Sequence, residues 1–436
     1  MTTQENAIDF NSPAYKRSRA AYTWECAFEY FVSLLVSGAF LSKLLLSIGM
    51  SDALIGIISS FISLSYLFQL FSIFVVQRIT NTKRFAVLFH SLGQVLFMFI
   101  YLVPFLPFEY KHKELLVIIS ILLAYFGNYF VNSIIYRWGN SHVLPTRRGR
   151  FSATKEMISL ATGTVVTLVA GYVMDAFELA GKLESGFLFC SFAIFIFALC
   201  DFICLMLIKN KIKTPEEKRE KAPLREVIKN TLGNKNFLNI TALQILWDVG
   251  RFVTVGFIST YSLNVTELAF TVGSVQIISL LGHGTRFAIS RPFGRYSDKH
   301  SYAKGIELGL VLAAIAFGSA IFMTPTTRFL YIVYMIFQNS CHAGVGANLL
   351  NVTYSYVNEK YVSEAMAIKN SISGICGFFA SLVASALLTD VQANGNVFLG
   401  MNLYGQQVLA AISFLVMIIA ILFTKFVIEK QKIMVQ

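Results

Sequence analysis

KNKIKTPEEKREKAPLREVIKNTLGNK, residues 209–235, is the longest polar stretch between the two ends of the chain, and it lies across the midpoint of the 436 residues. Nine of its residues are Lys or Arg, and Pro215 and Pro223 interrupt any long helix. A long and overwhelmingly apolar block lies on either side. Two hydrophobic halves joined by a basic linker are typical of a protein that crosses a membrane many times.

The overall composition favours the same class. Hydrophobic residues make up 56% of the chain, charged residues 14%, and the mean hydropathy is +0.63. Soluble globular chains have about 25% charged residues, so the composition indicates a membrane protein. The net charge of +12 does not indicate nucleic-acid binding, because the basic residues cluster in short loops between apolar segments. The six cysteines lie within apolar segments without a second close pair, so we predict no metal site and no cofactor.

Apolar segments of membrane-spanning length occur six times before the linker and six times after it. We therefore predict an all-α integral membrane fold with twelve helices: an N-terminal bundle (1–208), a cytoplasmic basic linker (209–235) and a C-terminal bundle (236–436). The predicted spans are 21–47, 52–76, 84–106, 115–138, 153–174, 187–208, 237–261, 268–292, 303–323, 328–352, 366–388 and 404–428.

The positions of the basic residues predict the orientation. The first twenty residues are polar and precede a span too long for a signal-peptide core, so we expect the N-terminus to stay in the cytoplasm. With that orientation about 26 Lys and Arg face the cytoplasm and four face outward, as positive-inside sorting requires. We predict a multi-pass protein of the inner (cytoplasmic) membrane with both termini cytoplasmic.

The two halves are weakly similar to each other. A shift of 217 residues places Gly56 on Gly273, and a shift of 214 residues places Lys155 on Lys369. Two six-helix halves around a site near the bilayer midplane are a common plan for transporters.

One loop suggests a family. In RPFGRYSDKHSYAK (291–304), Gly294 is followed four residues later by Asp298 and then by the spaced basic residues Lys299 and Lys304. A Gly permits close helix approach, an Asp can cap a helix, and Lys can bond exposed carbonyls. The loop resembles a signature of the major facilitator superfamily, and the resemblance implies a cytoplasmic gate.

A second loop, VLPTRRGRFSATKE (143–156), is similar to the helix 4–5 loop of many members and adds Arg147 and Arg150 to the expected gate. The first-half counterpart of the signature loop, QRITNTKRF (77–85), departs from the pattern because Asn81 stands where Asp is expected. The resemblance implies two pseudo-symmetric six-helix bundles in a monomer, with helices 1, 4, 7 and 10 around a central cavity.

Helix one has polar residues at every fourth position, namely Glu25, Glu29, Ser33 and Ser37, which places them on one face. A carboxyl group inside the membrane normally faces protein or water. We interpret Glu25 and Glu29 as proton-coupling residues. The alternatives are that Glu25 snorkels or caps, and that Glu29 forms a structural ion pair.

Helix four has Tyr125, Asn128, Tyr129, Asn132 and Tyr136 at helical spacing. Aromatic faces next to amide groups suit a flat or polyhydroxylated ligand, so we predict that these residues bind substrate. The alternative is a Tyr-rich packing seam.

Helix seven has Gln244, Trp247, Asp248 and Arg251 close together. We assign Gln244 and Trp247 to substrate binding and Asp248 and Arg251 to coupling. Because Asp248 and Arg251 are three residues apart, they can also neutralise each other as an internal ion pair.

Helix ten offers Asn339 and His342, three residues apart, as further substrate-binding candidates; the alternative for His342 is a structural role. Lys155 and Lys369 have matching positions and are interpreted as gate or lipid-interface residues. Asp201, inside helix six, has no explanation from the sequence beyond an unseen partner.

These patterns predict a secondary active transporter that works by alternating access. The favoured substrate is a small polar organic solute such as a sugar or glycoside, with proton symport. One alternative is efflux of organic cations by proton antiport, and an alternative of another class is a lipid flippase or scramblase. No GxSxG or HExxH motif is present, so an enzyme is not expected. The expected partners are a small-molecule substrate, membrane lipids and a coupling proton or cation, but no nucleic acid.

Overall fold

A computed structural model describes residues 12–76, 81–144, 147–209, 231–264, 266–357 and 362–431. Most of the predicted linker therefore lies outside the described residues. The first half of the chain consists of α1 (Pro13–Leu35), α2 (Gly38–Ser47), α3 (Asp52–Ser59), α4 (Phe61–Val76), α5 (Thr82–Ile100), the 3-10 turn η1 (Val103–Phe105), α6 (Tyr110–Asn140), α7 (Arg148–Leu179) and α8 (Leu183–Leu207).

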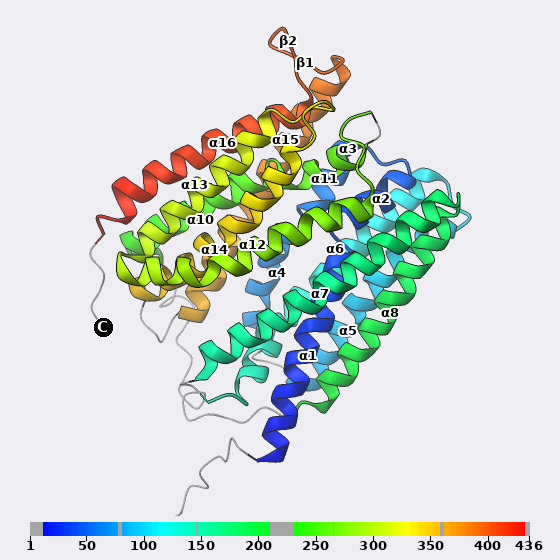
Figure 1. Cartoon of the computed structure of the whole chain (residues 1–436). Coiled ribbons are helices and arrows are strands. Elements are labelled where there is room, and N and C mark those ends of the chain that lie inside the picture. The colour runs from blue at the N-terminus through cyan, green and yellow to red at the C-terminus, as the bar shows by residue number, and fades with distance from the viewer. Residues whose placement is uncertain are drawn as a thin grey trace, which may run out of the picture.

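The second half is built in the same way. It consists of α10 (Lys235–Phe252), α11 (Val255–Leu263), α12 (Val272–Lys299), α13 (Tyr302–Ile321), α14 (Leu330–Tyr356), α15 (Val362–Ala393), α16 (Gly405–Phe423) and the π-helical turn η5 (Thr424–Ile428). A small hairpin of β1 (Val397–Phe398) and β2 (Met401–Asn402) joins α15 to α16. In Figure 1 the blue-to-green helices α1–α8 form one bundle and the green-to-red helices α10–α16 form the other.

Each predicted span corresponds to one helix or to one broken pair, so the twelve-helix prediction is confirmed. The pairs are α1 with α2, α3 with α4, and α10 with α11. In the described part of the chain, nine helices are long and apolar enough to cross a membrane, or up to ten if α1 and α2, bent by 42°, count as one. The bend between α1 and α2 coincides with Gly38, whose φ of +53° is accessible to Gly without strain.

Short polar side chains define where many helices begin. Asn81 accepts a hydrogen bond from the Arg84 amide at 3.1 Å at the start of α5. Ser301 accepts one from the Lys304 amide at 3.1 Å at the start of α13. These caps satisfy backbone donors that the first helical turn leaves unpaired. Asn81 therefore serves as a helix cap in the loop that departs from the family pattern.

The two halves contact each other through small hydroxyl side chains. The Ser42 and Ser259 hydroxyl oxygens lie 2.7 Å apart between α2 and α11, and the Ser60 and Ser381 hydroxyl oxygens lie 2.6 Å apart between α3–α4 and α15. The α7 helix also packs against α12. We call the zone in which α2, α3 and α11 meet the α2/α11 end. It joins the halves through neutral groups of low volume.

Gly374 provides a test of how closely the halves must approach. A Cβ atom there would lie 2.2 Å from the Ser63 carbonyl oxygen of α4, whereas one at Gly346 of α14 would meet nothing within 4 Å. Overpacking costs about 1–3 kcal/mol. We expect Gly374→Ala to lower the thermal unfolding midpoint in detergent, with little change for Gly346→Ala. Equal midpoints for the two variants would contradict this packing.

Candidate functional site

Three tyrosines from two helices of the first half form an aromatic group. The rings of Tyr125 and Tyr129 on α6 lie 6.1 Å apart, and Tyr66 of α4 meets Tyr129 edge-on at 5.6 Å. Tyr125 also packs on Phe97 of α5 at 5.1 Å. The stripe predicted on helix four thus fits both earlier interpretations, a packing seam and a substrate site. Tyr125 belongs to a packing seam, whereas Tyr129 is only partly buried and remains a candidate for substrate binding.

Arg251 of α10 connects this group to the second half. Its guanidinium charge acts electrostatically on Tyr66 and Tyr129 of the first half and on His342 of the second. Glu29 of α1, which is half-buried, acts in turn on Tyr129. We call Glu29, Tyr66, Tyr129, Arg251 and His342 the central site. Its members come from α1, α4, α6, α10 and α14, so both halves contribute to it.

A second polar network lies beside the central site. The Gln244 side-chain amide donates to Asp248 at 3.1 Å, and the Lys369 ammonium donates to the Gln244 amide oxygen at 3.3 Å and to the Thr353 hydroxyl at 3.2 Å. Lys369 is 1% exposed, so the predicted position at a lipid interface is wrong. Its charge also acts on Asp248. The network holds α10, α14 and α15 together.

The predicted internal pair of Asp248 with Arg251 is also wrong. Among the described residues Asp248 is bound by Gln244, while the Arg251 guanidinium lies 4.5 Å from the centre of the Phe252 ring. Lys369 acts on Asp248 in place of Arg251, so the Arg251 guanidinium can take part in the central site. Trp247 meets the His342 ring edge-on at 5.5 Å, so these two predicted substrate-binding residues are brought together.

Two amides that were predicted to bind substrate instead lie at contacts between helices. The Asn128 amide oxygen accepts from Gln94 of α5 at 3.4 Å, and Gly93 of α5 packs closely against it. The Asn339 amide nitrogen donates to the Met335 carbonyl at 2.8 Å at the contact with α12. Helical spacing identifies a shared face, but it does not identify the helix opposite that face.

The other members of the helix-four stripe lie nearer the start of α7. Asn132 is half-buried, and Tyr136 is 53% exposed with the Lys155 ammonium 5.9 Å from its ring centre. Lys155 lies closer to Tyr22, whose hydroxyl oxygen it approaches to 3.2 Å. Lys155 is therefore held by aromatic side chains of the first half.

Glu25 lies in a buried cluster with His90 of α5 and Asp201 of α8. The His90 Nε2 and Asp201 Oδ2 atoms are 2.9 Å apart, and Glu25 is 1% exposed. The alternative in which Glu25 snorkels or caps is wrong, and Asp201 has the partner that the sequence did not identify. His90 received no role from the sequence, although its spacing of four residues from Gln94 was a usable signal.

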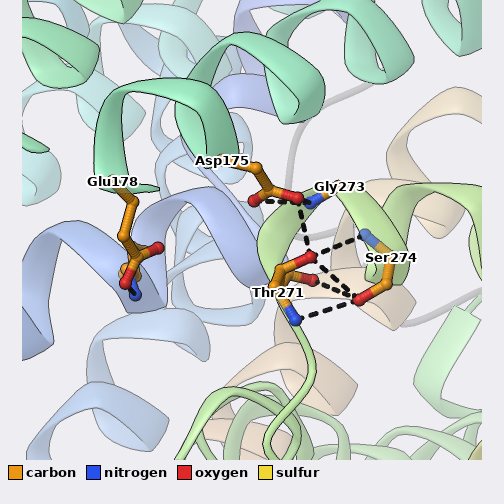
Figure 2. A network of polar contacts seen from close by, with 6 residues as sticks. Asp175, Glu178, Thr271, Gly273 and Ser274 are labelled. Atoms are coloured by element: carbon orange, nitrogen blue, oxygen red, sulfur yellow. Dashed lines mark hydrogen bonds and ion pairs between the residues drawn. The ribbon is translucent and has the colours of Figure 1, made fainter. Parts of the chain in front are cut away.

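Asp175 links the halves near the α2/α11 end. Its carboxylate accepts the Thr271 hydroxyl at 2.6 Å and the Gly273 amide at 3.0 Å, so a residue of α7 caps the first turn of α12 (Figure 2). The neighbouring Glu178 pairs instead with Lys43 of α2, within the first half. Of the two carboxylates, Asp175 bridges the halves and Glu178 does not.

The predicted gate loop is only partly as expected. A Cβ atom at Gly294 would meet nothing within 4 Å, so the close helix approach expected there is not present. Ser301, not Asp298, caps the next helix. Asp298 and Lys299 are exposed, and Lys304 pairs with Glu429 at 3.4 Å. Arg147 is exposed, and Arg150 lies in α7 with a side chain outside the described residues.

One ion pair joins the halves away from the α2/α11 end. Arg286 of α12 approaches Glu156 of α7 to 3.1 Å, and both side chains are partly exposed. An exposed pair contributes little to stability, so it can break and re-form as the helices move.

Comparison with known proteins identifies the family. The family profile of the Major Facilitator Superfamily matches residues 26–381. The chain belongs to the major facilitator superfamily. Members of this superfamily are multi-pass membrane transporters, which agrees with the twelve helices and the site shared by both halves. No curated protein matches the chain.

Solved structures of the superfamily share its fold at low sequence identity. The nucleoside transporter NupG has a TM-score of 0.65 at 14% identity, with 97% of this chain and 100% of that chain covered. The xylose transporter XylE from E. coli has a TM-score of 0.67 at 12% identity, with 97% and 100% covered. An auto-inhibited POT family peptide transporter has a TM-score of 0.70 at 12% identity, with 96% and 98% covered.

We expect Asp175→Ala to open the α2/α11 end, because the first turn of α12 loses a charged hydrogen-bond acceptor. A hydrogen bond to a charged group contributes about 1.5 kcal/mol or more to stability. A cysteine placed at the buried Ser259, in a variant without the six native cysteines, should react with a maleimide roughly tenfold faster in detergent. Glu178→Ala is the matched control and should leave the rate unchanged. Equal labelling rates in the two variants would show that Asp175 does not hold this end closed.

Glu267, in the turn between α11 and α12, makes the same end sensitive to pH. Burial, together with the nearby Asp52 carboxylate, raises the pKa of Glu267 to about 8 from its model-compound value of 4.5. Tyr261 of α11 also faces it. An open end would return Glu267 to water and lower its pKa. The closed end therefore binds one more proton than the open end between about pH 4.5 and about 8, so closure weakens as pH rises through this window.

Spin labels at the exposed Leu179 of α7 and Met401 of the hairpin can test this. We expect the fraction of molecules with the longer distance between the two labels, which is the open end, to grow from pH 5 to pH 8 and to stay constant above pH 8. Glu267→Gln should remove the pH dependence. A pH dependence that persists in the Gln variant would show that another group is responsible.

Proposed function

We propose that the chain is a secondary active transporter that carries a small polar organic solute, preferably a sugar or glycoside, by proton symport. The two halves would rock about the central site and expose it to one side of the membrane at a time. The proposal also places the chain in the inner (cytoplasmic) membrane as a monomer, with both termini cytoplasmic and the halves divided at residues 209–235.

The observation that carries the proposal is the convergence of both halves at Arg251. Two tyrosines of one half and a histidine of the other lie within the electrostatic reach of its guanidinium. Aromatic faces bind the apolar face of a sugar ring, and the guanidinium and imidazole groups can hydrogen bond to hydroxyl groups. A solute bound there would touch both halves and would sense their relative movement.

The neighbouring network keeps this arrangement free of an internal ion pair. Gln244, which is itself held by Lys369, donates to Asp248, and the Arg251 guanidinium has no carboxylate partner among the described residues. The Phe252 ring packs against it. Arg251 is thus available for a ligand. We propose that Asp248 acts on coupling through this network rather than by direct contact with the solute.

We propose Glu29 as the coupling residue. It is half-buried, it lies one helical turn from the buried cluster, and its charge acts on Tyr129 of the central site. A carboxyl group at the edge of a polar site can exchange a proton with water when the site is open. Protonation would remove the charge that faces Tyr129 and so alter solute binding.

The named substrates of the solved relatives agree with a polar organic solute. One relative is a xylose transporter and another a nucleoside transporter, and both substrates carry a hydroxylated ring. These names support the class of solute only. Screening of sugars, glycosides, nucleosides, amino acids and organic cations by thermal shift would select the compound for transport assays.

Glu29→Gln should abolish uptake driven by an imposed proton gradient in proteoliposomes, because the amide cannot carry a proton. Counterflow exchange of the same solute should persist, since it requires no net proton movement. Glu109→Gln, at an exposed carboxyl before α6, is the matched control and should retain driven uptake. Driven uptake by the Glu29 variant would exclude this residue as the carrier of the proton.

The same vesicles separate the competing functions. Accumulation of organic cations against an opposite proton gradient would indicate antiport. Movement of labelled phospholipid without any response to solutes would indicate a lipid transporter. Either result would overturn the proposed sugar symport.

A further inference from the structure

The buried cluster of Glu25, His90 and Asp201 is distinct from the central site. Its residues come from α1, α5 and α8, three helices of the first half, and none is more than 1% exposed. One ligand-type atom from each, a carboxylate oxygen or an imidazole nitrogen, lies within 4.8 Å of the other two. Sequence spacing could not reveal the group, because its members are 65 and 111 residues apart in sequence.

The polar atoms of this cluster are poorly satisfied by the protein. In the described structure Asp201 Oδ1 and the second imidazole nitrogen of His90, Nδ1, have no hydrogen-bond partner, and Asp201 Oδ2 has His90 Nε2 beside it at 2.9 Å. Glu25 receives only the weak thiol donor of Cys26, at 3.1 Å. A fully buried carboxylate without donors is costly unless a cation lies beside it.

The protein supplies too little positive charge to the cluster. Even a protonated His90 would offset only one of the two carboxylates. The charge of Lys155 on α7 also acts on Glu25, but its ammonium group lies against Tyr22. Glu29, one turn along α1, adds further negative charge. A cation bound among these three side chains would offset the negative charge that remains.

We propose that Glu25, His90 and Asp201 bind a divalent transition-metal ion of the Zn²⁺ or Mn²⁺ class. Two carboxylates and one imidazole match the ligand preferences of these ions. Ligand atoms about 2.1 Å from a tetrahedral ion lie about 3.4 Å apart. His90 Nε2 and Asp201 Oδ2 are already 2.9 Å apart, and the atoms separated by up to 4.8 Å must move together by about 1 Å or more.

Gln94 completes the ligand set. Its amide nitrogen lies 3.3 Å from His90 Nε2, and its amide oxygen is buried without a partner. A half-turn of the amide would give up the 3.4 Å hydrogen bond to Asn128, place this oxygen beside the cluster and give four ligands, as a tetrahedral ion requires. Because the site is closed on all sides by the first half, the ion is a resident component that joins α1, α5 and α8. It is separate from the solute of the central site.

The test uses the purified full-length protein in detergent. After removal of metal by a chelator and reloading with Zn²⁺ or Mn²⁺, elemental analysis should give close to one ion per chain. His90→Gln and Asp201→Asn should each lose most of this metal. The matched controls His112→Gln and Asp390→Asn change the same residue types at exposed positions and should retain it. Reloading should also raise the thermal unfolding midpoint of the wild type and of the controls.

Co²⁺ gives a second readout that does not depend on how well the variants fold. Bound Co²⁺ should show the visible absorption of a four-coordinate ion in the wild-type protein, and Gln94→Ala should shift that spectrum without abolishing binding. Absence of stoichiometric metal from the wild type would overturn the proposal. So would equal loss of metal from the His90 and His112 variants. Protonated carboxylic-acid bands in the infrared spectrum of metal-free protein, unchanged on addition of metal, would show that protons neutralise the cluster instead.

Discussion

Polar side chains that lie among the membrane-spanning helices have to find their partners within the protein, because the lipid offers none. Most of the polar architecture follows from this constraint. Lys369 is satisfied by Gln244 and Thr353, Asn128 by Gln94, and Asn339 by a carbonyl of its own helix. The groups that remain incompletely satisfied are therefore informative. Two of them matter most for function: Asp201, whose Oδ1 atom has no partner, and the Arg251 guanidinium, which has no carboxylate partner among the described residues. At each of these places we propose a ligand.

The sequence predicted the helices well, because membrane-spanning segments are defined by length and hydropathy, and both are local properties. The predicted segment 52–76 coincides with the combined bounds of α3 and α4. The helix breaks were not predicted. The bend after α1 depends on the backbone conformation at Gly38, and no Pro marks it. The membership of the superfamily followed from the loops 291–304 and 143–156 and from the helix count.

The site was less predictable, because helical periodicity gives the face of a residue but not the neighbour of that face. Arg251 and Asp248 share a face of α10, yet Asp248 is neutralised by a lysine 121 residues later in the chain. In the same way, Glu25 and Glu29 share a face of α1, but one enters a cluster with α5 and α8 and the other stays half-buried near α6. Such pairings are decided by packing between distant helices.

The serine pairs between the halves have a consequence for the kinetics of movement. A neutral hydroxyl pair contributes only about 0.5–1.5 kcal/mol, and each hydroxyl can turn back to a carbonyl of its own helix when its partner leaves. Ser259 and Ser381 already make such bonds, to Gly256 and Phe378. Separation of these serine pairs would therefore strand no charge and leave few donors unpaired. A seam of this kind adds little to the free energy that opening must overcome.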